Sequence, residues 1–71
     1  MIEVYDYDDK NVTIPGALVT RETDKALLVE VEGEQLWIPK SQVHDDSDVY
    51  QDGDHGDLVI SRWIAEQKEL V

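Results

Sequence analysis

Two short apolar runs on either side of Glu32 and Gly33 form the clearest pattern in the chain, in the stretch KALLVEVEGEQLWIPK. Such runs around a two-residue turn signal are typical of a β-hairpin. With a two-residue loop, Val31 lies opposite Glu34 and the pairing continues outward along both strands. A longer turn, with Gly33 in the left-handed conformation and a bulge, would shift every pair by one residue. The pattern leaves both registers open.

The predicted hairpin carries apolar side chains on both faces. In the two-residue register, one face is almost entirely apolar and contains Leu27, Val29, Val31, Leu36 and Ile38. The opposite face brings Leu28 next to Trp37, at the end distant from the turn. A sheet that is apolar on both sides must be curled or covered there, so we expect another element to pack on Leu28 and Trp37.

The first part of the chain predicts a strand, a turn and a second strand. Residues 2–7, IEVYDY, keep the alternation of a strand in part, and residues 8–11 are typical of a turn. The stretch VTIPGALVTRET resumes a β pattern but contains Pro15 and Gly16, which favour an edge, a bulge or a sharp bend. We therefore expect the continuous strand to start at Ala17.

The last part of the chain changes from a strand pattern to a helical one. DLVIS predicts a short strand over residues 57–61, and Ser61 suits the N-cap of a helix over residues 62–70. Trp63 and Ile64 fall on the apolar face of this helix. Because so short a helix is not stable alone in water, we expect it to dock on Leu28 and Trp37 and to bury Trp63.

These elements predict one domain of the β-rich α+β class over residues 1–71. The expected architecture is a small bent antiparallel sheet, or a partial SH3-like or OB-like barrel, of about four or five strands with a short C-terminal helix. A chain of 71 residues buries only about 60% of its unfolded surface, which leaves no room for a deep cleft. Residues 44–57, HDDSDVYQDGDHGD, predict a flexible acidic loop, with a short strand over 48–51 as an option.

The acidic net charge argues against proteins that bind nucleic acids or membranes directly. Seventeen acidic and six basic side chains give a formal charge of −11. Binding to nucleic-acid phosphates or to anionic membranes normally depends on Lys and Arg, so direct binding to duplex DNA and to membranes is disfavoured. The expected partner is a basic surface of another protein. The sequence shows no cysteine, no signal-peptide pattern and no apolar stretch of membrane-spanning length, which predicts a cytoplasmic protein.

Two segments, RETDKALLVEVEGEQLWIPKSQV and LVISRWIAEQKEL, resemble a small module of phage and bacterial proteins to which no activity is attached. The elements that carry the resemblance are Glu22, Thr23, Lys25, Ala26, Gly33, the run from Trp37 to Ser41, and Trp63. The resemblance covers about residues 20–43 and 58–70. It implies a compact β-rich unit encoded by a phage or mobile element and acting in a bacterial host, and it assigns no catalytic residue.

The acidic stretch has oxygen and nitrogen ligands for a metal but lacks the spacing of a known metal-binding loop. A calcium loop needs oxygen ligands at alternate positions and a glycine at the sixth, but counting from Asp46 puts Tyr50 at the fifth position and Gln51 at the sixth. A loose site of Asp52, Asp54 and Asp57 is the weaker alternative. Zinc bound by His44 and His55 would need carboxylates to complete its coordination. We expect no metal and no cofactor.

Enzymatic chemistry is also disfavoured. Acid–base catalysis by carboxylates needs one of them desolvated, and aspartates between glycines in a loop are solvated. Ser41 and Ser61 have no histidine and acid at a recognisable spacing. We predict a protein that is not an enzyme.

The functional hypothesis for the acidic residues is electrostatic. Alternate side chains on an extended segment lie about 6.6 Å apart, a spacing comparable with that of successive phosphates, so such carboxylates could mimic nucleic acid and occupy a basic groove. An anti-defence inhibitor of a host nucleic-acid-handling protein is the sharpest form of this hypothesis; the plain alternative is a solubilising surface. The candidate partner-binding residues are Asp45, Asp46, Asp48, Asp52, Asp54, Asp57, Glu30, Glu32, Glu34 and Trp37.

Trp37 leaves further alternatives open. As a core residue it would have no role in binding. If it is exposed beside Lys40 and Arg21, it could anchor a protein interface or stack a base of single-stranded nucleic acid. An accessory module for single strands or replication proteins, and a structural or dimerising domain that uses the hairpin, are therefore the alternative functions.

Overall fold

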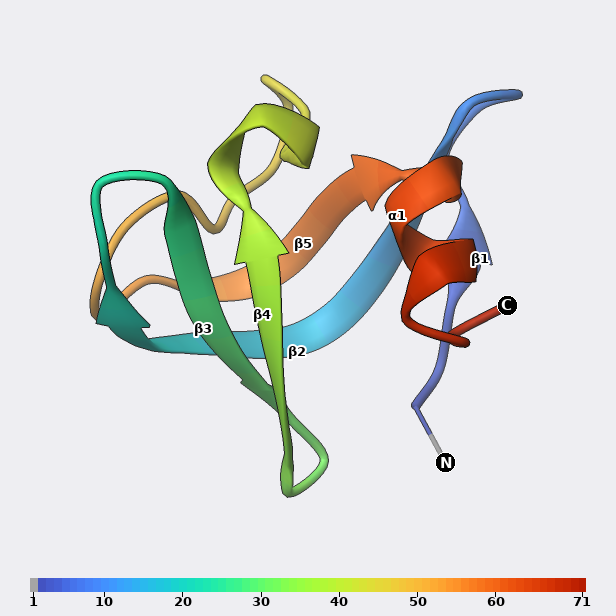
Figure 1. Ribbon diagram of the computed structural model, residues 1–71. Helices are drawn as coiled ribbons and strands as arrows, with labels where there is room; N and C mark the ends of the chain where they lie inside the picture. Colours follow the sequence, from blue (N-terminus) through green and yellow to red (C-terminus); the bar gives the residue numbers. More distant parts are fainter. Residues whose placement is uncertain (1) are drawn as a thin grey trace.

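The computed structural model describes residues 2–71 and confirms the predicted fold class: a five-stranded antiparallel sheet with one short C-terminal helix (Figure 1). The elements in chain order are β1 (Tyr5–Asp6), β2 (Asn11–Glu22), β3 (Ala26–Val31), β4 (Glu34–Pro39), the 3-10 helix η1 (Lys40–Gln42), β5 (His55–Ser61) and α1 (Arg62–Gln67). The strand order is β1-β2-β3-β4, and β5 also pairs with β2.

Strand β2 is long and bent, and it links the two parts of the sheet. Its first part pairs with β1 and β5, whereas its second part pairs with β3. The register against β5 shifts between Ile14 and Ala17, where Gly16 has a φ of 70°. The prediction that the continuous strand starts at Ala17 was wrong: the strand starts at Asn11, because the bulge at Pro15 and Gly16 bends it without ending it.

The hairpin of β3 and β4 has the two-residue register. Val31 pairs with Glu34, and Leu28 pairs with Trp37. Glu32 and Gly33 have φ angles of 49° and 82°, as a type I′ turn requires at both central positions. The longer turn with a bulge does not form.

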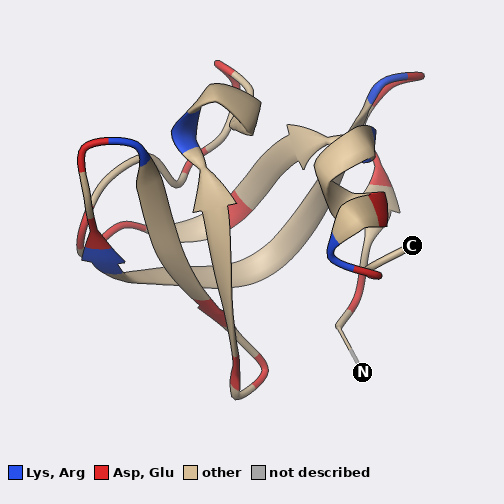
Figure 2. Cartoon of the chain, viewed as in Figure 1, with Lys and Arg blue, Asp and Glu red and all other residues tan. Residues whose placement is uncertain are grey.

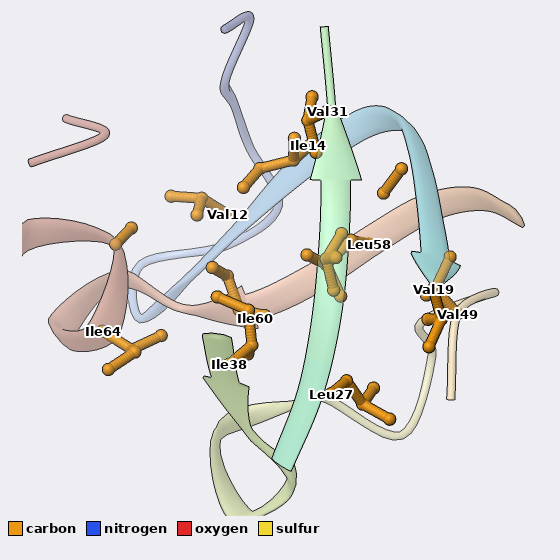
Figure 3. Close-up of a cluster of buried hydrophobic side chains, with 13 residues drawn as sticks. Val12, Ile14, Val19, Leu27, Val31, Ile38, Val49, Leu58, Ile60 and Ile64 are labelled. Atoms are coloured by element: carbon orange, nitrogen blue, oxygen red, sulfur yellow. The ribbon is translucent and has the colours of Figure 1, made fainter. Parts of the chain in front are cut away.

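The core lies inside the bent sheet (Figure 3). The inner face of the hairpin buries Leu27, Val29, Val31 and Ile38 as predicted. Strands β2 and β5 close the core from the other side with Val12, Ile14, Ala17, Val19, Leu58 and Ile60. Leu36 is half-buried at the margin of this cluster. The bend of β2 is therefore what lets one small sheet enclose its own apolar face.

Helix α1 begins as predicted and docks elsewhere. The Ser61 Oγ accepts a hydrogen bond from the Ile64 N–H at 3.2 Å, which confirms the N-cap. The helix ends at Gln67, sooner than predicted, and it contacts β2 and β5. Docking on the patch of Leu28 and Trp37 was wrong, because the helix follows β5 without a linker and the end of β5 lies beside β2.

Trp63 is 57% exposed, so the prediction that it is buried was also wrong. Ile64 and Ala65 occupy the interface with the sheet. Trp63 precedes Ala65 by two residues, which is about 200° around a helix, and it therefore lies on the solvent side.

Several boundaries also differ from the predictions. Strand β1 contains Tyr5 and Asp6, while Ile2 and Val4 pack half-buried against the core. Strand β5 begins at His55, earlier than expected, and residues 48–51 form no strand. No helix in the described part of the chain has the length and apolar character needed to cross a membrane.

Candidate functional site: the acidic loop

The acidic loop between η1 and β5 is anchored by Ser47. Its Oγ accepts hydrogen bonds from the N–H groups of Val49 and Val59, at 3.2 and 3.1 Å, and donates to the Val49 carbonyl at 3.0 Å. Val49 is fully buried in the core and Ser47 is 7% exposed. The Asp48 N–H also donates to the Asp57 carbonyl at 2.9 Å. The backbone in the middle of the loop is thus attached to the sheet. The predicted flexibility of the loop stays a prediction.

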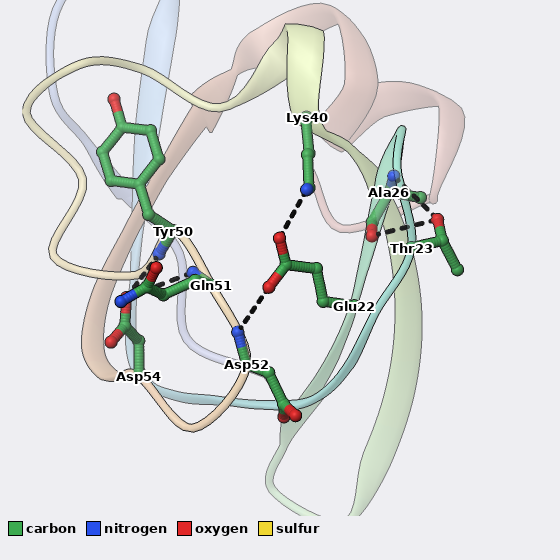
Figure 4. Close-up of polar contacts among 8 residues, drawn as sticks. All are labelled: Glu22, Thr23, Ala26, Lys40, Tyr50, Gln51, Asp52 and Asp54. Atoms are coloured by element: carbon green, nitrogen blue, oxygen red, sulfur yellow. Dashed lines mark hydrogen bonds and ion pairs between the residues drawn. The ribbon is translucent and has the colours of Figure 1, made fainter.

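Asp54 closes the second half of the loop. One oxygen of its carboxylate accepts hydrogen bonds from the N–H groups of Tyr50 and Gln51 at 3.0 and 3.1 Å (Figure 4). Its backbone carbonyl accepts from the Val19 N–H at 2.9 Å, and the Gly53 N–H donates to the Val19 carbonyl at 3.0 Å. Asp54 therefore shapes the loop, although the sequence placed it among the partner-binding candidates.

Glu22 fastens the loop to the end of β2. One of its carboxylate oxygens lies 2.5 Å from the Lys40 Nζ, and the other accepts from the Asp52 N–H at 3.0 Å (Figure 4). The bond from Lys40 and the bond from the Asp52 N–H lower the pKa of Glu22. No pattern in the sequence indicates this role of Glu22, because its two partners are distant in the chain.

Tyr7 joins the β1–β2 segment to the loop. Its hydroxyl donates a hydrogen bond to the Asp46 carboxylate, and its ring lies 5.0 Å from the His44 ring, centroid to centroid. The Asp46 N–H in turn donates to the His44 Nδ1 at 3.0 Å. The bond to Asp46 raises the pKa of Tyr7. The Lys10 N–H and the Asn11 side chain donate hydrogen bonds to the Asp8 carboxylate and lower its pKa.

Tyr50 completes this corner of the loop. Its hydroxyl donates to the His44 carbonyl at 2.9 Å and lies 3.5 Å from the Asp45 Oδ1. Burial of the hydroxyl, and then the charge of Asp45, raise the pKa of Tyr50. The tyrosines and His44 were missed as site residues, because an aromatic residue in an acidic segment gives no signal of the contacts that it will make.

The exposed carboxylates of this region form what we call the acidic loop surface. Its members are Asp45, Asp46, Asp48, Asp52 and Asp57. Within residues 2–71 the charged side chains form two ion pairs, Lys40 with Glu22 and Arg62 with Asp6, and neither includes a member of this surface. Burial alternates from Asp46 to Tyr50, with Ser47 and Val49 inside, so Asp46 and Asp48 both project outward.

The hairpin glutamates do not join this surface. The turn that carries Glu32 and Glu34 lies at the bottom of the molecule in Figures 1 and 2, whereas η1 and the start of the acidic loop lie at the top. Glu30 is half-buried and pairs with Leu18 of β2. The acidic candidate residues therefore divide into the acidic loop surface and a separate acidic turn.

Trp37 lies on the outer face of the hairpin and is 41% exposed. Its cross-strand neighbour Leu28 is half-buried, and Leu18 of β2 is 38% exposed on the same side of the sheet. Leu28 also has a cross-strand partner on β2, which is Arg21. Because α1 docks elsewhere, this apolar strip remains at the surface.

The described residues contain no metal-binding cluster, and the chain matches no known family. Within residues 2–71 no group of three or more histidine, aspartate or glutamate side chains is arranged to hold a metal ion. No protein-family model matches the chain, and comparisons with curated proteins and with solved structures found no significant match. The class that can be stated is a small, strongly bent β-sheet protein with one short helix and an anchored acidic loop.

Proposed function

We propose that this chain is a non-enzymatic protein-binding protein whose acidic loop surface engages a basic surface of a nucleic-acid-handling protein. The observation that carries the proposal is an anchored loop with four exposed aspartates, next to Asp57 of β5, none of which has an ion-pair partner within residues 2–71. Unpaired carboxylates on one loop attract a cationic protein and repel polyanions.

The anchoring of the loop favours binding. Ser47, Asp54 and Glu22 hold the backbone at three places, so the loop loses less conformational entropy when a partner binds than a free chain would. Asp46 and Asp48 alternate with the buried Ser47 and Val49, so both project from the loop into solvent. Neighbouring exposed carboxylates of this kind could take the place of phosphate charges in a basic groove.

The biological setting in this proposal is a bacterial cytoplasm. A phage or mobile element would gain from a small acidic protein that occupies the nucleic-acid groove of a host enzyme, and inhibition of a defence protein is the sharpest form of the proposal. The small core of a chain of this length is in keeping with a binding role.

The test is capture from nuclease-treated bacterial lysate on the immobilised protein, at about 50 mM and about 200 mM salt. We expect nucleic-acid-binding proteins to be retained at low salt and to be displaced by a duplex DNA oligonucleotide. The triple variant Asp45→Asn, Asp46→Asn, Asp48→Asn should lose them. The matched control Glu30→Gln, Glu32→Gln, Glu34→Gln removes the same charge from the hairpin and should retain them. Equal losses in both variants, or no such protein at low salt, would contradict the proposal.

A second candidate function rests on the exposure of Trp37. An exposed tryptophan on a sheet can stack a base of single-stranded nucleic acid, as in an accessory module for single strands or replication proteins. The charge of −11 opposes this function. Quenching of tryptophan fluorescence by short oligonucleotides, absent in Trp37→Leu and kept in Trp63→Leu, would support it over the first candidate.

A further inference from the structure

His44 lies at the start of the acidic loop, and its contacts define its protonation state. The side chain is half-buried. Its Nδ1 accepts a hydrogen bond from the Asp46 N–H at 3.0 Å, which requires that this nitrogen carries no proton. The ring also lies 5.0 Å from the Tyr7 ring, centroid to centroid. The structure therefore describes this corner of the loop with a neutral His44.

The carboxylates beside His44 favour its charged form. Asp45 and Asp46 follow it directly in the chain and are both exposed. The Asp46 carboxylate is held at this corner by the hydroxyl of Tyr7. Asp8, which follows Tyr7, also interacts electrostatically with His44. Nearby negative charge stabilises a protonated imidazole, so this corner attracts the charged ring although the Asp46 N–H accommodates only the neutral one.

Residues from other elements complete the surroundings of His44. Tyr50 donates its hydroxyl to the His44 carbonyl at 2.9 Å. Arg62 of α1 lies 3.5 Å from the Asp8 carbonyl, but its guanidinium is paired with Asp6 at 2.7 Å. The hollow beside His44 is also lined by uncharged residues, which are Asn11, Ser41, Gln42, Val43 and Ser61. The charged groups around the ring are therefore mostly carboxylates.

We propose that His44 is a pH-sensitive switch of the acidic loop. Histidine gains its charge between about pH 8 and about pH 5. When Nδ1 takes up a proton from solvent it becomes a hydrogen-bond donor, so it no longer accepts from the Asp46 N–H. The charged ring stays among the carboxylates and turns so that Nδ1–H donates to one of them. The Asp46 N–H is then released to water.

The switch changes the acidic loop surface. Charged His44 offsets the charge of a neighbouring carboxylate, and release of the Asp46 N–H removes one of the bonds that shape the loop beside η1. Only the consequence for binding rests on the proposed function: a basic partner should be captured less well at about pH 5.5 than at about pH 7.5. The structural change does not depend on any partner.

The test is an NMR titration of the full chain from about pH 8 to about pH 5.5. The His44 ring protons report its protonation, and amide exchange with water, corrected for the intrinsic rate at each pH, reports the bond from the Asp46 N–H. We expect the protection of this amide to fall about fivefold, with the same midpoint as the ring. The Ser47 N–H donates to the His44 backbone carbonyl at 3.0 Å. Its protection should stay constant, because that bond does not involve the ring.

Two matched variants separate the switch from general effects of pH. His44→Phe keeps an aromatic ring against Tyr7 but removes the acceptor and the charge, so the Asp46 N–H should have low protection at every pH. His55→Phe changes the other histidine, which is exposed on β5, and should behave like the parent. Circular dichroism confirms that both variants are folded.

The parent titration alone can overturn the proposal, through constant protection of the Asp46 N–H while the His44 ring titrates. An equal pH-dependent loss of protection in His44→Phe would overturn it as well. A transition in the parent without capture of any partner supports the switch and contradicts only the proposed function.

Discussion

Ser47 shows how one side chain can determine the shape of an acidic segment. Its hydroxyl satisfies the N–H groups of Val49 and Val59, and the neighbouring aspartates project outward because Ser47 and Val49 are inside. A buried N–H without an acceptor costs free energy. The position of the acidic loop surface thus depends on an uncharged residue that the sequence analysis did not select.

Ser47→Ala should lower the free energy of unfolding by about 1–3 kcal/mol, because it leaves two N–H groups without an acceptor. Urea denaturation measures the change. Ser41→Ala, at an exposed position of η1, is the control and should stay within about 0.5 kcal/mol of the parent. Equal stability of the two variants would mean that Ser47 does not hold the loop.

Glu22 gives a pH dependence with a defined sign. The ion pair with Lys40 and the bond from the Asp52 N–H lower its pKa below 4.5 in the folded state. A lowered carboxyl pKa stabilises the fold at pH values above the unfolded pKa, and this contribution is lost as the pH falls through the folded pKa. The stability difference between the parent and Glu22→Gln should therefore be largest near pH 7 and shrink below pH 4.5. A difference that is constant across this range would contradict the assignment.

At the scale of elements, the bend in β2 decides the fold. The strand pairs with β5 on both sides of the bulge at Pro15 and Gly16, and with β3 from Leu18 to its end. Gly16 has a φ of 70°, and no atom lies within 4 Å of the position that a Cβ would take. Any cost of a side chain there comes from the backbone conformation and not from a clash.

Gly16→Ala should therefore destabilise the protein by about 1–2 kcal/mol, and Gly16→Asn by less, because Asn adopts the left-handed region more readily. Thermal denaturation of the two variants and the parent measures the order. An alanine variant as stable as the parent would show that the strand can bend there without a positive φ.

For the whole molecule, charge opposes compaction. The chain has seventeen acidic side chains, and the described residues form two ion pairs. The acidic residues lie both along the loop and at the hairpin turn (Figure 2). Self-repulsion of this kind destabilises the compact state and is screened by salt.

The urea midpoint should rise as sodium chloride increases from about 0.01 M to about 1 M. The triple variant Asp45→Asn, Asp46→Asn, Asp48→Asn should be more stable than the parent at low salt and should respond less to salt. These carboxylates make no ion pair within residues 2–71, so their removal relieves repulsion. A midpoint that falls with salt would contradict this account.

The sequence by itself determined the local features. The structure decided between the two hairpin registers. The hairpin itself follows from Glu32, Gly33 and the alternation beside them, and the start of α1 follows from Ser61. Both rest on residues that are close in the chain, where side-chain period and backbone preference leave few choices. The fold class and the buried inner face of the hairpin follow from the same patterns.

The tertiary structure alone decided which distant residues meet. It brought Tyr7 to Asp46 and Glu22 to Asp52, separated the hairpin glutamates from the loop, and left Trp37 and Trp63 at the surface. Each of these outcomes depends on the direction in which β2 bends and on where α1 can reach from the end of β5. Contacts between distant residues are set by such geometry, and the pattern of apolar and polar positions along a chain does not contain it.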